Sequence, residues 1–124
     1  MTPDLPPLTT DTIWAILTEE LDDDTVLRLT WQALGYRYNA KTEAWQNEAV
    51  DPSWREVYPE PPDFIAYRPP TVKLTRSIPK ANKQLLKTDL GFKGYKIGEF
   101  GPRQTRRATI ASWLLSQMRE QGLF

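Results

Sequence analysis

Residues 71–107 read TVKLTRSIPKANKQLLKTDLGFKGYKIGEFGPRQTRR and contain most of the positive charge of this chain. Ten of the sixteen basic residues and two of the sixteen acidic residues lie here, so the stretch carries a formal charge of +8. Residues 1–70 hold thirteen acidic and five basic residues, a formal charge of −8, and the whole chain is neutral. This separation of charge predicts either that the two halves attract each other or that the basic half meets an anionic partner.

Hydrophobic spacing around the basic stretch predicts a single α+β domain over residues 10–124, preceded by a loose proline-containing arm at residues 1–9. About five helices are expected, near residues 10–21, 22–34, 51–58, 77–90 and 102–118, where apolar side chains recur every three or four positions. Alternation predicts a small, mainly antiparallel sheet of three to five short strands, drawn from residues 36–38, 44–47, 64–68, 71–76 and 95–99. The chain length suffices for one modest core.

The absence of two residue types limits the chemistry that this chain can perform. It contains no cysteine and no histidine, so disulfides, thiolate chemistry, soft-metal sites and histidine-based triads are excluded. No serine has a candidate base nearby, and the glycines of residues 98–105 lack the lysine and spacing of a phosphate-binding loop. No apolar run approaches the roughly 18 residues of a membrane span. We therefore expect a cytoplasmic, non-enzymatic protein without cofactor or metal.

Three arginines lie where the last predicted helix begins: Arg103, Arg106 and Arg107. Cations are unfavourable at this end, because the helix dipole is already positive there. One interpretation is an anion or carboxylate site built from the guanidinium groups and free backbone N–H groups. The alternative is pairing within the chain, with the acidic residues at 22–24 or with Glu60 and Asp63.

The middle of the chain is dense in aromatic residues that are interrupted by prolines, and it leads directly into basic residues. A flexible partner peptide needs a few anchors, and a strand edge, an aromatic slot and a cation are suitable ones. We predict such a site in residues 63–76 and the aromatic residues before them. Its candidate residues are Trp45, Trp54, Tyr58, Phe64, Tyr67, Arg68, Lys73 and Arg76. The alternative is that these aromatic residues form the core.

A second functional hypothesis is binding of single-stranded nucleic acid, RNA in particular, by residues 71–107. The segment Gly91-Phe-Lys-Gly94 has the GXXG form of the loop with which KH domains clamp a nucleic-acid backbone. Nearby aromatic residues could stack on bases while the basic residues neutralise phosphates. The alternative is that both glycines are turn residues with positive φ.

Six segments resemble a small family of cyanobacterial proteins known as a domain of unknown function. They are LGYRY (34–38), PEPPDFI (59–65), TVKLTRSIP (71–79), NKQLLK (82–87), LGFKGYKIGE (90–99) and TRRATIASWLL (105–115). The resemblance covers nearly the whole chain. It implies a relation to the CcmS-type assembly chaperones of the β-carboxysome, which are homodimers that bind the C-terminal extension of a hexameric shell protein. It assigns no contact residue.

Overall fold

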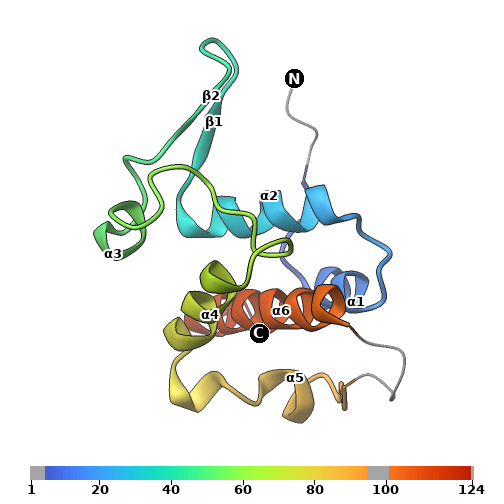
Figure 1. Cartoon of the computed structure of the whole chain (residues 1–124). Coiled ribbons are helices and arrows are strands. Elements are labelled where there is room, and N and C mark those ends of the chain that lie inside the picture. The colour runs from blue at the N-terminus through green and yellow to red at the C-terminus, as the bar shows by residue number, and fades with distance from the viewer. Residues whose placement is uncertain (1–4, 95–100, 124) are drawn as a thin grey trace.

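The computed structural model describes residues 5–94 and 101–123 and confirms an α+β fold. In chain order its elements are α1 (Thr10–Leu17), α2 (Asp23–Leu34), β1 (Arg37–Asn39), β2 (Ala44–Gln46), α3 (Pro52–Arg55), α4 (Arg68–Ser77), the 3₁₀ turn η1 (Lys80–Asn82), α5 (Leu85–Thr88) and α6 (Pro102–Glu120). The two strands form an antiparallel hairpin that stands away from the helices (Figure 1). Among the described residues, none of the helices is long and apolar enough to cross a membrane.

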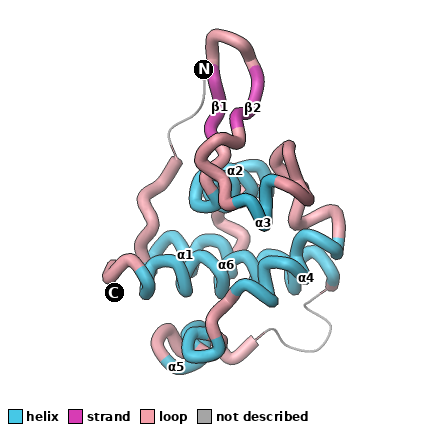
Figure 2. The backbone as a smooth tube through the Cα atoms, turned by 90° about the vertical axis from the view of Figure 1, so that its left-hand side faces the viewer, coloured by secondary structure: helices cyan, strands magenta, loops and turns pink. Residues whose placement is uncertain are grey.

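Helix α6 is the centre of the molecule. Helices α1 and α4 lie on either side of it, α2 lies across one face and α5 across the opposite face (Figures 1 and 2). Because neighbours surround it, α6 buries side chains in several directions, among them Ile110, Trp113, Leu114 and Met118. The predicted apolar stripe of the last helix is therefore the contact surface for α1, α2, α4 and α5.

Local sequence signals set the bounds of α2 and the hairpin as predicted. The Asp22 carboxylate accepts a hydrogen bond from the backbone N–H of Thr25 at 2.8 Å, which caps the start of α2. Gly35 ends the helix with φ of 111°, and a Cβ atom there would collide with the Ala49 carbonyl. In the hairpin that follows, Tyr38 pairs with Trp45 and their rings meet edge to face at 5.4 Å.

The strands predicted at 64–68 and 71–76 are wrong. Residues 64–66 form a turn, and Arg68–Ser77 is helix α4. The proline pair at 69–70, which suggested an interruption, instead occupies the first turn of this helix, where a missing N–H costs nothing. Thr71, Leu74 and Ile78 are buried at helical spacing, whereas the alternation of Val72 and Leu74 fitted a strand equally well.

The predicted sheet of three to five strands is also too large, since the described residues contain one two-stranded sheet. The strand predicted at 95–99 lies outside the described residues. The helix predicted over 77–90 is divided into η1 and α5. Asn82, at the end of η1, donates hydrogen bonds to Ser116 at 3.1 Å and Glu120 at 2.8 Å, so contacts with α6 fix this segment.

Residues 5–9 approach α1 without regular structure. Leu5 and Leu8 pack partly buried against the core. The Thr9 hydroxyl caps α1 by accepting from the N–H of Thr12, and the Thr12 hydroxyl donates to the Pro7 carbonyl at 2.6 Å. These contacts hold the described part of the N-terminal arm on the helical body.

Candidate functional site

An open, mainly apolar pocket of about 620 Å³ lies beside the N-terminal end of α4. Its most exposed apolar side chains are Tyr67, 65% exposed, and Val57, 57% exposed. Prolines form much of the remaining wall; the full lining is Val57, Tyr58, Pro59, Glu60, Pro61, Pro62, Asp63, Tyr67, Pro69 and Pro70. An aromatic ring set among prolines is a surface on which an extended chain can lie.

A second pocket of about 410 Å³ adjoins the first, and Tyr58 and Pro69 line both. The basic side chains Lys73 and Arg76 border it; its full lining is Ser53, Trp54, Tyr58, Pro69, Val72, Lys73, Arg76 and Ser77. The Lys73 ammonium lies 5.0 Å from the centre of the Trp54 ring, a cation–π contact that holds it beside the pocket. We call the two pockets together the aromatic–basic groove.

The loop of residues 58–63 forms the proline wall and is tied to the body by three side chains that donate to its carbonyl groups. The Tyr36 hydroxyl donates to Tyr58 at 2.5 Å, the Trp31 indole to Pro62 at 2.7 Å, and the Asn47 amide to Pro59 at 2.9 Å. Prolines lack an N–H and restrict the backbone further. The groove is therefore shaped before a ligand arrives, which lowers the entropic cost of binding.

Burial raises the pKa of the Tyr36 phenol to about 12, and the neighbouring Tyr58 phenol acts in the same direction. A phenol with this pKa keeps its proton at neutral pH. Its hydrogen bond to the Tyr58 carbonyl is thus maintained throughout the physiological range, and with it the position of the groove wall.

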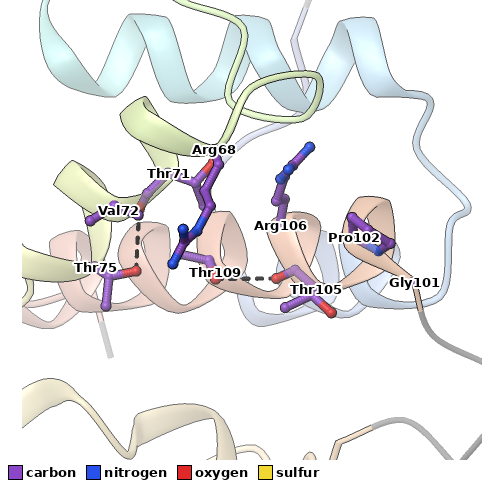
Figure 3. Close-up of a pocket in the computed structure, with 9 residues that line it drawn as sticks. All are labelled: Arg68, Thr71, Val72, Thr75, Gly101, Pro102, Thr105, Arg106 and Thr109. Atoms are coloured by element: carbon purple, nitrogen blue, oxygen red, sulfur yellow. Dashed lines mark hydrogen bonds between the residues drawn. The ribbon is translucent and has the colours of Figure 1, made fainter.

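A third pocket, of about 600 Å³, lies on the other side of α4, between that helix and the start of α6 (Figure 3). Two arginines border it, Arg68 from α4 and Arg106 from α6. The other lining residues are Thr71, Val72, Thr75, Gly101, Pro102, Thr105 and Thr109. We call it the α4–α6 pocket.

The structure pairs two of the three predicted anion-binding arginines with carboxylates of the acidic half. Arg103 forms two hydrogen bonds with Asp23, at 2.7 and 2.9 Å, and an ion pair with Glu19. Arg107 is fully buried and donates to Asp23 at 2.7 Å and to the carbonyls of Ile16 and Leu21. Arg106 donates to the Ile65 carbonyl at 2.8 Å. Arg103 and Arg107 thus follow the alternative interpretation, in which the arginines pair with acidic residues of the same chain.

These contacts change the pKa values of the groups involved. The hydrogen bond from Arg103 holds the pKa of Asp23 below its ordinary value of 3.8; burial opposes this shift and Arg107 reinforces it. The same bond with Asp23 raises the pKa of Arg103. Asp23 is therefore ionised at neutral pH and fixes the start of α2 against the first turns of α6.

The predicted peptide-binding residues fall into three places. Trp54, Tyr58, Tyr67, Lys73 and Arg76 line the aromatic–basic groove, although Trp54 is only 6% exposed. Arg68 borders the α4–α6 pocket instead.

The remaining two aromatic residues lie elsewhere. Phe64 is fully buried beneath the groove against Trp54, with ring centres 5.9 Å apart. Trp45 is on the hairpin, where its ring meets that of Trp31 from α2 edge to face, with ring centres 5.1 Å apart. The predicted strand edge does not exist, because residues 68–77 are helical.

Sequence patterns did not identify the apolar residues that complete the groove, chiefly Val57, Val72 and the prolines of the wall. The run PEPP at 59–62 was visible, but the hydrogen bonds that the loop of residues 58–63 accepts from Trp31, Tyr36 and Asn47 join segments that are distant in sequence. Within the described residues, no group of three or more acidic side chains could hold a metal ion. Gly91 and Gly94 have φ of 75° and 99°, as expected of turn glycines.

The geometry is that of a small helical domain with a preformed surface groove. The family described as Domain of unknown function (DUF1823) matches residues 7–119, and the chain belongs to this family. A solved structure described as "Solution NMR structure of the protein" is 55% identical in sequence, covers 94% of this chain and 98% of its own, and superposes with a TM-score of 0.84. No curated protein matches the chain.

Proposed function

We propose that this protein is a non-enzymatic assembly factor that binds a flexible segment of a partner protein in the aromatic–basic groove. The observation that carries the proposal is the groove itself, which places exposed Tyr67 and a proline wall next to Lys73 and Arg76. A flexible segment loses entropy when it is ordered, so its affinity must come from a few strong anchors. This groove offers one apolar anchor site and one basic anchor site a short distance apart.

The ligand is an extended or short-helical segment with at least one apolar side chain and one acidic group. The apolar side chain packs between Tyr67, Tyr58 and the prolines, and the acidic group meets Lys73 and Arg76. Side-chain contacts supply the affinity, because α4 has no free strand edge to pair with the peptide backbone. The resemblance of the sequence to carboxysome assembly chaperones supports one particular partner, the C-terminal extension of a β-carboxysome shell protein.

A direct test measures binding of a fluorescently labelled peptide with the sequence of that extension. We expect Tyr67→Ala to weaken binding about tenfold or more, as loss of a central aromatic anchor does, and Lys73→Gln with Arg76→Gln to weaken it and reduce its salt dependence. Tyr38→Ala on the hairpin and Lys80→Gln on η1 are matched controls outside the groove and should bind like the wild type. Unchanged affinity of the Tyr67→Ala protein would contradict the site.

Nucleic-acid binding by residues 71–107 is the competing outcome. Arg103 and Arg107 are engaged by carboxylates of the same chain, so fewer cations face solvent than the sequence suggests. Titration of a labelled single-stranded oligonucleotide at 0.15 M salt should give no micromolar binding. Binding at that strength, with a steep decrease in affinity as salt rises, would favour the nucleic-acid function instead.

A further inference from the structure

The α4–α6 pocket lies outside the groove but adjoins it, because Val72 lines both the pocket and the basic part of the groove. The Arg68 side chain extends from the first turn of α4 along this pocket toward Thr109 (Figure 3). Arg106 rises from the first turns of α6 beside it (Figure 3). Two guanidinium groups thus border one cavity of about 600 Å³.

Three of the four threonines that line the pocket already donate their hydroxyl protons to backbone carbonyls. Thr71 donates to the carbonyl of Phe64, Thr75 to that of Thr71, and Thr109 to that of Thr105. These three residues therefore offer methyl groups and acceptor lone pairs to a ligand, whereas the arginines offer N–H donors. The pocket combines a surface of methyl groups with a cationic rim.

No carboxylate of the described residues balances the charge at this rim. The lining that the described residues form contains no acidic side chain. In the described part of the chain, neither Arg68 nor Arg106 has a carboxylate within 4 Å, in contrast to Arg103 and Arg107. The hydrogen bond of Arg106 goes to a neutral carbonyl and occupies one of its five N–H groups. An anion at the rim could accept hydrogen bonds from guanidinium groups that form no ion pair with a carboxylate of the described residues.

The lining selects the class of anion. Among the described residues, no aromatic ring borders the pocket, so none of them offers a surface on which a nucleotide base could stack. A carboxylate on a short aliphatic stem fits both features, since its stem contacts the methyl groups of Val72 and the threonines while its oxygens accept from a guanidinium fork.

We propose that the α4–α6 pocket receives an acidic side chain of the same partner segment that occupies the aromatic–basic groove, after the segment crosses α4 at Val72. The inference rests on the proposed function for the source of the carboxylate. The segment then carries two recognition elements, an apolar residue for the groove and a glutamate or aspartate beyond it for Arg68 and Arg106.

The chemistry of the pocket can be tested without the partner. Backbone amide NMR signals of Val72, Thr105 and Thr109 should shift with butyrate at millimolar concentration and not with its neutral isostere butyramide. Arg68→Gln should weaken this response about tenfold, and Lys80→Gln, which removes an exposed cation elsewhere, should leave it within twofold. Absence of the butyrate response, or saturation by inorganic phosphate at a lower concentration, would overturn the assignment.

The source of the carboxylate is tested with peptides in which acetyl-Leu-Pro is joined to Glu-amide by Gly-Ser spacers of increasing length. Affinity should pass through a maximum when the spacer spans the two sites. Arg68→Gln should remove this gain and Tyr67→Ala should weaken the leucine end. No gain at any length, with the butyrate response intact, overturns the link to the partner segment. A different outcome contradicts the proposed groove: the gain in affinity is lost in Arg68→Gln but is unaffected by Tyr67→Ala.

Discussion

Arg107 is the residue on which the packing of α1 and α2 against α6 most depends. Its fully buried guanidinium bonds to Asp23 and to two backbone carbonyls, those of Ile16 and Leu21. Loss of this side chain removes the donor to the Leu21 carbonyl and leaves the Ile16 carbonyl with a long hydrogen bond from the Glu19 N–H at 3.4 Å. It also takes one of two cations from Asp23. Buried polar groups without partners are costly.

Arg107→Met should therefore lower the free energy of unfolding by about 1–3 kcal/mol, the usual cost of leaving a buried polar group without its partner. Arg103→Met removes a cation from the same Asp23, but its side chain is 44% exposed, so its loss should cost roughly 0–1 kcal/mol. Urea denaturation of both variants measures the difference. Equal effects would show that the buried carbonyl bonds contribute nothing.

Asp23 also makes stability depend on pH. Its pKa in the folded protein lies below the ordinary 3.8 because Arg103 donates to it, so the ionised carboxylate favours the folded state. That stability is fully present above about pH 5 and is lost as the pH falls through 3.8 toward the folded-state pKa. Asp23→Asn should make the free energy of unfolding less dependent on pH between about pH 2 and 5. Glu56→Gln, which removes a carboxylate without an ion pair in the described residues, is the matched control.

Among the elements, α2 was predictable and α4 was not, for a physical reason. Asp22 and Gly35 are local signals, since each acts on backbone groups of its own neighbourhood. The residues around Leu74 fit both a strand and a helix, and burial of Thr71 against the turn before α4 decides between them. For the groove, the sequence identified Tyr67 and Lys73 but could not show that Phe64 is core, because exposure depends on distant segments.

The start of α4 can be tested through two threonines on the same helix. The buried Thr71 hydroxyl donates to the Phe64 carbonyl at 2.5 Å, whereas the exposed Thr75 hydroxyl donates to the Thr71 carbonyl at 3.2 Å. Thr71→Val keeps the shape but leaves a buried carbonyl without its donor, so unfolding should be easier by about 1–3 kcal/mol. Thr75→Val should change stability by less than about 0.5 kcal/mol. Chemical denaturation compares the two, and a smaller effect at Thr71 would contradict this role.

At the scale of the whole molecule, the cations form two groups although the net charge is zero: some pair with carboxylates of the same chain, and others do not. The arginines that face α1 and α2 join the basic half to the acidic half through Asp23 and Glu19. The cations of α4, namely Arg68, Lys73 and Arg76, have no carboxylate within 4 Å in the described residues. Helix α4, which separates the groove from the α4–α6 pocket, therefore carries three cations that no carboxylate of the described residues pairs.

The hairpin bears on the oligomeric state of the protein. Strands β1 and β2 are three residues each and project from the helical body beyond α2 (Figure 1). No further strand of the described residues pairs with their outer edges. Exposed edges favour pairing with another chain, and we expect a homodimer with the hairpins at its interface. Light scattering at tens of micromolar should give twice the chain mass of 14.4 kDa. A monomer mass at that concentration would exclude the dimer, and since the groove and the α4–α6 pocket are built from α3 to α6, peptide binding would remain testable on the monomer.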